Sequence, residues 1–405
     1  MTVRRYTFYL FLGFIFSLPW QNAFSIGGSR TLSSLVGAGV VWLTLSVLLA
    51  EWRLARPTAL LITMILFCAW QASSIIWSID PGLTQVRAFR LIQLVAMVWA
   101  VGELAESEEQ RRSLMQAFVL GCFVVIAAVV QSYASGVAIE GYRYSPQQFS
   151  LNETADTLAL GIIMALILLI HSKTRVLSWV NMAFIPLAVF AVILTASRSG
   201  FVATCLALIG VPFVLRATKP VYRVVWAALI FGAFAFLFFG VPNNSSLQEN
   251  LRRVTFSQET DTLRTMTGRT DIWAAAFSVL REHPAAGIGA GTFATGVGSR
   301  LDRARAPHNL FVSVAVETGL VGLFFICAVL VSSLVPVIRG PSDTKALYLV
   351  LFAVLFATAL VANVDTSKVL WFGLALLSLA GREPALQHAE TDAYPREPLT
   401  PLPHG

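Results

Sequence analysis

Apolar runs of about 20 residues recur along almost the whole chain and are separated by short polar connections. Such a run has the length of an α-helix that crosses the hydrocarbon core of a bilayer. Of the 405 residues, 56% are hydrophobic and only 13% are charged, whereas a soluble domain typically has about 25% charged residues. The alternating segments of about 10 residues that a membrane β-barrel would need are absent. The sequence therefore predicts an all-α polytopic membrane protein.

We place about twelve helices across the membrane, with one long hydrophilic insertion between the ninth and the tenth. Their expected ranges are 7–24, 31–50, 58–77, 83–101, 114–134, 154–171, 179–196, 200–215, 222–240, 308–337, 345–362 and 367–381. The run 308–337 is longer than a bilayer requires, so this helix is expected either to begin in the polar loop or to be tilted.

The first run is expected to be a retained anchor rather than a signal peptide, because eleven further runs follow it and no clear small-residue cleavage site is present. The last residues, 382–405, are rich in proline and poor in large apolar side chains. We therefore predict a single membrane domain over residues 1–381 and a disordered cytoplasmic tail over 382–405.

Lys and Arg are unevenly distributed between alternate connections. With the N-terminus in the cytoplasm, every cytoplasmic connection carries at least one of them, while the short outward loops carry only Arg30 and Arg143. Because cytoplasmic loops are enriched in Lys and Arg, this orientation places the insertion 241–307 on the periplasmic side. The net charge of +7 reflects that topology and does not indicate nucleic-acid binding. No Cys/His spacing predicts a metal site.

Short polar motifs lie at two of the expected membrane boundaries. The insertion contains the segments Thr267–Trp273 and His283–Phe293, and His308-Asn309 follows where the next apolar helix begins. Upstream, the segment Thr195–Gly200 contains Ser-Arg-Ser-Gly between two apolar runs. If both boundaries face the same side, two arginines and a histidine can meet at the membrane surface. That combination suits chemistry on a lipid-linked phosphate.

The insertion is expected to contain an amphipathic helix from about Thr270 to Glu282. Its expected apolar face consists of Ile272, Trp273, Ala276, Phe277 and Leu280, which suits a helix that lies on the membrane or roofs a cavity. Thr267 or Thr270 would cap its start, and Pro284 follows its end. The glycines at 287, 289 and 291 predict a flexible or tight turn after this helix.

Arg198, Arg269 and His308 are the candidate catalytic residues. Arginine is always charged, and its planar fork binds phosphate oxygens with two hydrogen bonds. Arg198 lies at a membrane boundary, where a cation needs a partner, and Arg269 stands at the expected helix start, where backbone N–H groups also favour anions. His308 can exchange a proton near neutral pH. The alternatives are arginines that reach lipid head groups and a histidine that serves as a polar interfacial cap.

Five further residues are candidate ligands of a diphosphate or a glycan. They are Arg87, Asn152, Arg303, Arg305 and Asn309. Arg87 would lie about 6 Å below the outward surface, at 1.5 Å per helical residue. It either extends an anion site or forms a structural ion pair, for which Asp156 and Glu317 are possible partners. The outward loops contain no compelling carboxylate cluster for a metal, so neither a metal nor a cofactor is expected.

Five motifs in a fixed order are similar to those of a known group of proteins. They are Ser-Arg-Ser-Gly at 197–200, Gly-Arg-Thr-Asp-Ile-Trp at 268–273, His-Pro-x-x-Gly-Ile-Gly-x-Gly-x-Phe at 283–293, His-Asn-Leu-Phe at 308–311 and Glu-Thr-Gly-Leu-Val-Gly at 317–322. Together they resemble the O-antigen ligase and O-antigen polymerase superfamily. The resemblance implies a bacterial inner-membrane glycosyltransferase with a GT-C-like fold and a periplasmic active site. The donor would be a glycan on undecaprenyl diphosphate, and the acceptor would be lipid A-core or a growing glycan.

The resemblance also implies catalytic roles for Arg198, Arg269 and His308. Its motifs do not separate a ligase, which we rank first, from a polymerase or a protein O-glycosyltransferase of the same superfamily. A transporter or flippase of lipid-linked saccharides would also suit about twelve spans. A flippase needs a charged path through the membrane, whereas the marked residues lie at one surface, which favours chemistry there.

Overall fold

The computed structural model describes residues 3–21, 37, 39, 41–46, 56–146, 149–171, 174–217, 220, 223–224, 245–255, 259–301, 306–340 and 342–380. Its helices are α1 (Val3–Ser17), η1 (Leu18–Trp20), α3 (Ala59–Ser73), η2 (Ser74–Ile76), α4 (Pro81–Leu104), α5 (Glu108–Ala134), α6 (Leu151–His171), α7 (Arg175–Thr195), α8 (Arg198–Leu208), α9 (Val211–Ala217), α11 (Ser246–Val254), α12 (Glu259–Glu282), α13 (Phe293–Gly298), α14 (Leu310–Arg339), α15 (Ser342–Val361) and α16 (Lys368–Ser378). The described residues are mostly helical and form no strand, which confirms the predicted all-α fold.

Within those ranges, eight segments are long and apolar enough to cross a membrane. They are Ala59–Ile76, Pro81–Leu104, Glu108–Ala134, Leu151–His171, Arg175–Thr195, Arg198–Arg216, Leu310–Arg339 and Thr344–Val361, and each overlaps a predicted span. The helix α16 is apolar but has 11 residues, and α1 has 15. The expected spans 31–50 and 222–240 lie largely outside the described residues, as does all of the tail 382–405. The number twelve and the domain limits therefore stay predictions.

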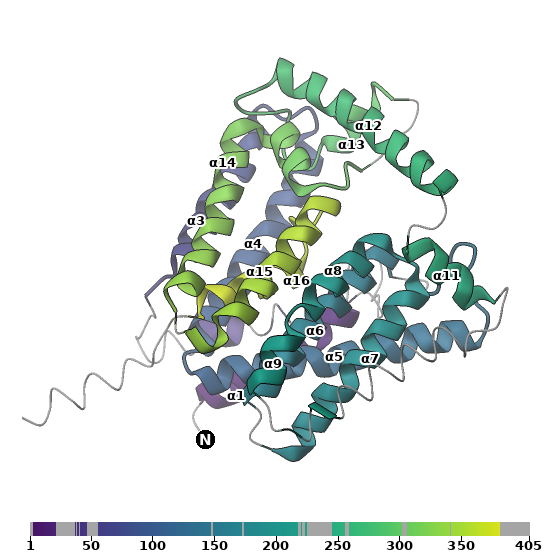
Figure 1. The fold of residues 1–405 in the computed structure, drawn as a ribbon. Helices are drawn as coiled ribbons and strands as arrows, with labels where there is room; N and C mark the ends of the chain where they lie inside the picture. Colours follow the sequence, from purple (N-terminus) through teal and green to yellow (C-terminus); the bar gives the residue numbers. More distant parts are fainter. Residues whose placement is uncertain are drawn as a thin grey trace, which may run out of the picture.

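Two groups of helices lie side by side in Figure 1. One contains α3, α4, α14 and α16, and the other contains α1 and α5 to α9. The helix α15 joins them, because it packs against α14 and α16 on one side and against α6 and α8 on the other. Buried apolar side chains form a core that extends through both groups. The helices α12 and α13 lie across one end of this bundle, which we call the insertion end (Figure 1).

The long helix α14 is broken into two halves. At Thr318 and Gly319 the backbone leaves the helical region, and Gly319 has φ 69° and ψ −170°. Only glycine adopts this conformation readily. The carbonyl freed at Thr318 accepts the indole N–H of Trp70 from α3 at 2.9 Å. This long span therefore contains a break that the sequence did not predict, and its expected tilt in a membrane stays a prediction.

The glycine-rich turn after α12 fills this break. Gly287, Gly289 and Gly291 all have positive φ angles, of 66°, 111° and 80°, which confirms the predicted tight turn. The N–H of Gly289 donates to the carbonyl of Glu317 (2.7 Å), and the N–H of Leu320 donates to the carbonyl of Pro284 (2.8 Å). The turn and the break in α14 thus satisfy each other's backbone polar groups, which attaches the insertion to the middle of α14.

The insertion helix begins earlier than predicted. The helix α12 starts at Glu259, not near Thr270, although it ends at Glu282 as expected. Gly268 does not interrupt it, because a single glycine in a helix costs only about 1 kcal/mol. Arg269 therefore lies within α12. The predictions that Thr267 or Thr270 caps this helix were wrong. The prediction that free N–H groups at a helix start bind an anion beside Arg269 was also wrong.

Part of the predicted apolar face of α12 packs onto the protein. Ile272, Ala276 and Val279 are buried together with Phe293 of α13 and Val316 of α14. Phe277 was predicted on the same face but is 50% exposed. This second, smaller core holds α12 across the insertion end.

Candidate active site at the insertion end

The Ser-Arg-Ser-Gly motif forms the turn between α7 and α8. The helix α7 ends at Ala196, whose φ of 48° is left-handed. Ser197 caps α8, because its hydroxyl accepts the N–H of Gly200 at 3.3 Å. A Cβ at Gly200 would come within 2.1 Å of the Cβ of Ala155, so glycine is what allows α8 to approach α6. Arg198 is thereby held at the first residue of α8.

Arg198 belongs to a group of three arginines at the end of α7, together with Arg143 and Arg253. The Nε of Arg198 donates to the carbonyl of Arg253 in α11 (3.1 Å). The Nε of Arg143 donates to the carbonyl of Thr195 (3.2 Å), and Nη1 of Arg143 pairs with Glu140 (2.8 Å). Burial, then the positive charge of Arg253 and more weakly that of Arg198, lower the pKa of Arg143, while Glu140 raises it. The guanidinium groups of Arg198 and Arg253 therefore lie within electrostatic range of Arg143.

The last turn of α7 brings these arginines together. Its Leu194 carbonyl accepts the backbone N–H of Tyr144 (3.0 Å) and the side-chain amide of Asn250 (3.3 Å). The first bond attaches the loop that carries Arg143, and the second attaches α11, which carries Arg253. Segments far apart in the sequence thus meet at one helix end.

Arg269 and His308 form the second part of the site. His308 lies just before α14, with an exposed side chain and a left-handed φ of 48°. Partial loss of solvent around the ring, and then the charge of Arg269, lower the pKa of His308 from its ordinary value. Trp273, one turn after Arg269 in α12, donates its indole N–H to the carbonyl of Pro307 (3.1 Å). The helix α12 therefore brings Arg269 close to His308.

The two predicted asparagine ligands hold the helices that carry these residues. The side-chain oxygen of Asn309 accepts the N–H of Val312 (3.0 Å), and its NH₂ group donates to the carbonyl of Leu360 (3.0 Å). The side-chain oxygen of Asn152 accepts the hydroxyl of Ser197 at 2.7 Å. A role for either amide in binding a glycan or a diphosphate stays a prediction.

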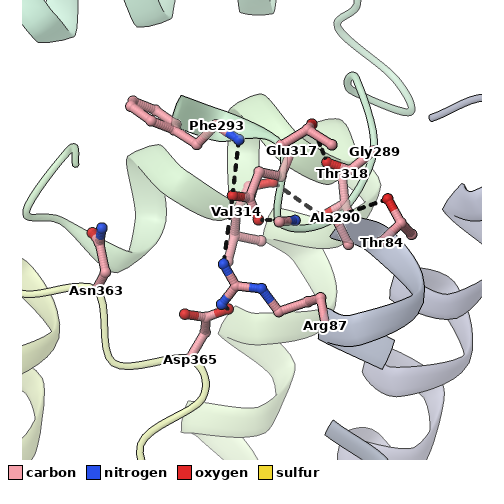
Figure 2. A network of polar contacts seen from close by, with 12 residues as sticks. Thr84, Arg87, Gly289, Ala290, Phe293, Val314, Glu317, Thr318, Asn363 and Asp365 are labelled. Atoms are coloured by element: carbon pink, nitrogen blue, oxygen red, sulfur yellow. Dashed lines mark hydrogen bonds and ion pairs between the residues drawn. The ribbon is translucent and has the colours of Figure 1, made fainter. Parts of the chain in front are cut away.

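Arg87 forms the structural ion pair that was one of its two predicted roles. Figure 2 shows its guanidinium between two buried carboxylates, 2.6 Å from Asp365 and 3.8 Å from Glu317. Glu317 also accepts the backbone N–H groups of Gly291 (2.9 Å) and Phe293 (3.3 Å). Glu317 is therefore confirmed as a partner of Arg87. The suggestion of Asp156 was wrong, since Asp365 is the second partner.

This buried network connects α4, α14, the glycine-rich turn and the α15–α16 connection (Figure 2). Because Arg87 has two carboxylates beside it, its charge is already balanced. We therefore assign it to the support of the insertion and do not include it in an anion site.

The other predicted site residues stand as follows. Arg198 lies with Arg143 and Arg253, and Arg269 lies near His308, whereas Arg303 and Arg305 fall outside the described residues. The predicted meeting of both parts in one cavity stays a prediction. In the described ranges, no three His, Cys, Asp or Glu side chains gather as a metal ion would require.

Arg143 and Arg253 are the residues that sequence reasoning did not select. Arg253 was one arginine among many in a polar loop, with no signal of its own. Arg143 did carry a signal, because it is one of only two basic residues in the short outward loops. A basic residue in an outward loop, where Lys and Arg are otherwise scarce, is a candidate site residue in the same way as a residue in a motif.

The match to a family model lies across both parts of the site. Residues 183–327 match the family described as O-antigen ligase, and this segment contains Arg198, Arg269 and His308. No curated protein matches the chain. The family match confirms the resemblance that the motifs carry: residues 183–327 of this multi-pass membrane protein are similar to the O-antigen ligase family.

Proposed function

We propose that this protein is a glycosyltransferase of the bacterial inner membrane that transfers a glycan from undecaprenyl diphosphate to an acceptor hydroxyl at the periplasmic face. We place an O-antigen ligase that acts on lipid A-core first and a polymerase second. The family match supports the general class, a glycosyltransferase-like protein that uses lipid-linked glycans and saccharide acceptors. The donor, the acceptor and the roles of individual residues are proposals.

The observation that carries this proposal is the group of three arginines at the end of α7. Like charges repel, and at the edge of a membrane the surrounding apolar groups screen that repulsion poorly. Glu140 pairs with Arg143 at 2.8 Å. A ligand with two or more negative charges would relieve the repulsion, and guanidinium forks match phosphate oxygens in geometry. A lipid diphosphate at a membrane boundary has that charge and that location.

The reaction needs charge stabilisation at one end and a base at the other. The acceptor oxygen forms a bond to C1 of the donor sugar, the bond between C1 and the diphosphate oxygen breaks, and the diphosphate keeps the electron pair. Fixed guanidinium groups stabilise the negative charge that grows on the leaving group, and loss of one such donor typically costs about 2.7–4 kcal/mol. A single displacement of this kind inverts the anomeric centre. Arginine takes the place of a divalent metal in this scheme.

His308 takes the proton of the acceptor hydroxyl. A base must be neutral before it accepts a proton, and the lowered pKa of His308 favours the neutral ring. Arg269 contributes to this, because its positive charge disfavours a protonated imidazole. The same guanidinium adds to the positive potential that faces the leaving diphosphate. Loss of the base is expected to reduce turnover by roughly 10²–10⁴-fold.

The test is transfer by the purified protein in liposomes that contain a defined undecaprenyl-diphosphate glycan. Three arms differ only in the acceptor: lipid A-core, a second lipid-linked glycan, or none. A product on lipid A-core indicates a ligase, a lengthened lipid-linked glycan indicates a polymerase, and no transfer in any arm contradicts the proposal. His308→Ala and Arg198→Ala should each reduce transfer, while Arg300→Gln serves as the control, because Arg300 pairs with Glu282 on the insertion.

A further inference from the structure

The backbone on both sides of His308 is held by side chains from two other parts of the fold. The imidazole itself has no hydrogen-bond partner in the part of the chain that the structure describes. Instead, the carbonyl of Pro307 accepts the indole N–H of Trp273 at 3.1 Å. The N–H of Asn309 donates to the side-chain oxygen of Asn363 at 3.1 Å. The two peptide groups that flank His308 are thus each fixed by one hydrogen bond.

This arrangement matters because His308 has an unfavourable backbone conformation. Its φ of 48° is left-handed, and in the described chain only Ala196 shares a positive φ among residues other than glycine. A non-glycine residue in this conformation is strained and persists only where the surroundings impose it. The two bonds to the flanking peptides supply that constraint. Without them the chain before α14 would be free to return to an ordinary conformation and turn the imidazole elsewhere.

We propose that Trp273 and Asn363 are positioning residues for His308 and that they set the direction of its imidazole toward the acceptor. This inference rests on the proposed role of His308 as the base. Neither residue needs to touch a substrate. They act by orienting the imidazole through its two flanking peptide groups, the part that a carboxylate plays for histidine in many hydrolases.

Trp273 also links Arg269 to His308. It follows Arg269 by four residues, so both lie on the same face of α12, about one turn or 5.4 Å apart. Its ring packs with the small core beneath α12. A movement of α12 would therefore displace Arg269 and release the Pro307 carbonyl at the same time. Trp273 therefore couples the orientation of His308 to the position of Arg269, whose charge lowers the pKa of His308.

Asn363 bonds to the peptide group after His308 and is itself firmly supported. It lies in the α15–α16 connection, two residues before Asp365, which pairs with Arg87 at 2.6 Å. The backbone carbonyl of Asp365 accepts the indole N–H of the fully buried Trp371 at 2.7 Å. Figure 2 shows Asn363 and Asp365 on this connection beside α14. The buried ion pair thus holds the segment from which Asn363 orients His308.

The test is a double-mutant cycle in the reconstituted transfer assay. Trp273→Phe removes the N–H donor while it keeps a smaller aromatic ring, and Asn363→Leu removes the acceptor at nearly constant size. Each should lower kcat by roughly tenfold, with little change in the KM for the donor, because a modest displacement of a catalytic group is costly. In the His308→Ala background the same substitutions should have no further effect, because the group that they orient is gone.

Two further variants serve as controls. Asn363→Asp keeps an acceptor oxygen for the Asn309 N–H and should retain most of the activity that Asn363→Leu loses. Trp42→Phe makes the same chemical change at a side chain that is 71% exposed, and it should be silent. If one substituted protein fails to fold, as judged by gel filtration, the other still tests the proposal, because Trp273 and Asn363 act from different elements.

The outcomes separate this inference from the proposed function. Equal losses from Trp273→Phe or Asn363→Leu with and without His308 would show a merely structural role and overturn the inference. So would wild-type kcat in both single variants. If His308→Ala itself transfers at the wild-type rate, the proposed role of His308 is wrong, and the positioning role is wrong with it. An effect that disappears only in the His308→Ala background supports both.

Discussion

Replacement of Gly319 by alanine should destabilise the protein strongly, because both its backbone and its surroundings exclude a side chain. Its φ of 69° and ψ of −170° lie in a region that is essentially restricted to glycine, and a residue forced to remain there costs about 1–3 kcal/mol. A Cβ would also lie 2.1 Å from the carbonyl oxygen of Ala285 and 2.5 Å from the nitrogen of Ala286. Both are backbone atoms, so no rotation of a side chain can relieve the contact.

The glycine-rich turn would have to retreat from the break in α14. That movement removes the bonds from Leu320 to Pro284 (2.8 Å) and from Val321 to Ala285 (3.4 Å). Each backbone hydrogen bond contributes about 0.5–1.5 kcal/mol net. Together with the backbone strain, the expected loss of stability is about 2–6 kcal/mol.

The measurement is thermal unfolding of the purified protein in detergent, followed by tryptophan fluorescence. Trp70 and Trp77 report on this region, because their indole N–H groups donate to the carbonyls of Thr318 and Ala286. Unfolding of membrane proteins in detergent is often irreversible, so all variants are heated at one rate. Gly102→Ala is the control, since no atom lies within 4 Å of its added Cβ. If Gly319→Ala unfolds at the same temperature as Gly102→Ala, the break does not depend on glycine and the reasoning is refuted.

Three more predictions concern the site. Arg269→Gln should move the acidic limb of the pH–rate profile to higher pH, because the charge of Arg269 lowers the pKa of His308 and the base acts when neutral. The kcat of the residual activity between about pH 5 and 8 measures this shift. A shift to lower pH would contradict the prediction. Arg143→Gln should weaken binding of undecaprenyl diphosphate by about tenfold or more, the usual cost of a hydrogen bond to a charged group; a binding titration beside Arg300→Gln checks it, and equal affinities in both variants would remove Arg143 from the anion site. Transfer should continue in the presence of EDTA; complete loss that Mg²⁺ or Mn²⁺ restores would show that arginines alone do not stabilise the leaving group.

The membrane class and most of the spans follow from local pattern alone. A bilayer demands apolar runs of a set length, and helices satisfy their backbone hydrogen bonds within the run. Each of the eight spans that the structure describes was therefore visible in the sequence. The tight turn at Gly287, Gly289 and Gly291 and the end of α12 before Pro284 were visible for the same reason, since the conformations of glycine and proline are local properties.

Local chemistry at the membrane boundaries and family resemblance together selected Arg198, Arg269 and His308, but neither carried any geometry. Only the tertiary structure placed Arg143 and Arg253 beside Arg198, because their proximity depends on two unrelated segments that bind one carbonyl at the end of α7. The early start of α12 was missed because Gly268 looked like a boundary, whereas packing of the following turns outweighs the small cost of one glycine in a helix.

The break in α14 shows most clearly where sequence reasoning ends. A run of apolar residues from 310 to 339 reads as one long helix. The break at Gly319 exists because the backbone of a turn some 30 residues earlier supplies hydrogen bonds that the helix gives up there. The hydrogen bonds from Trp273 and Asn363 to the peptide groups that flank His308 also join residues far apart in the sequence. The sequence by itself determined the elements that local interactions stabilise. The tertiary structure decided the position of each group whose partner lies far along the chain.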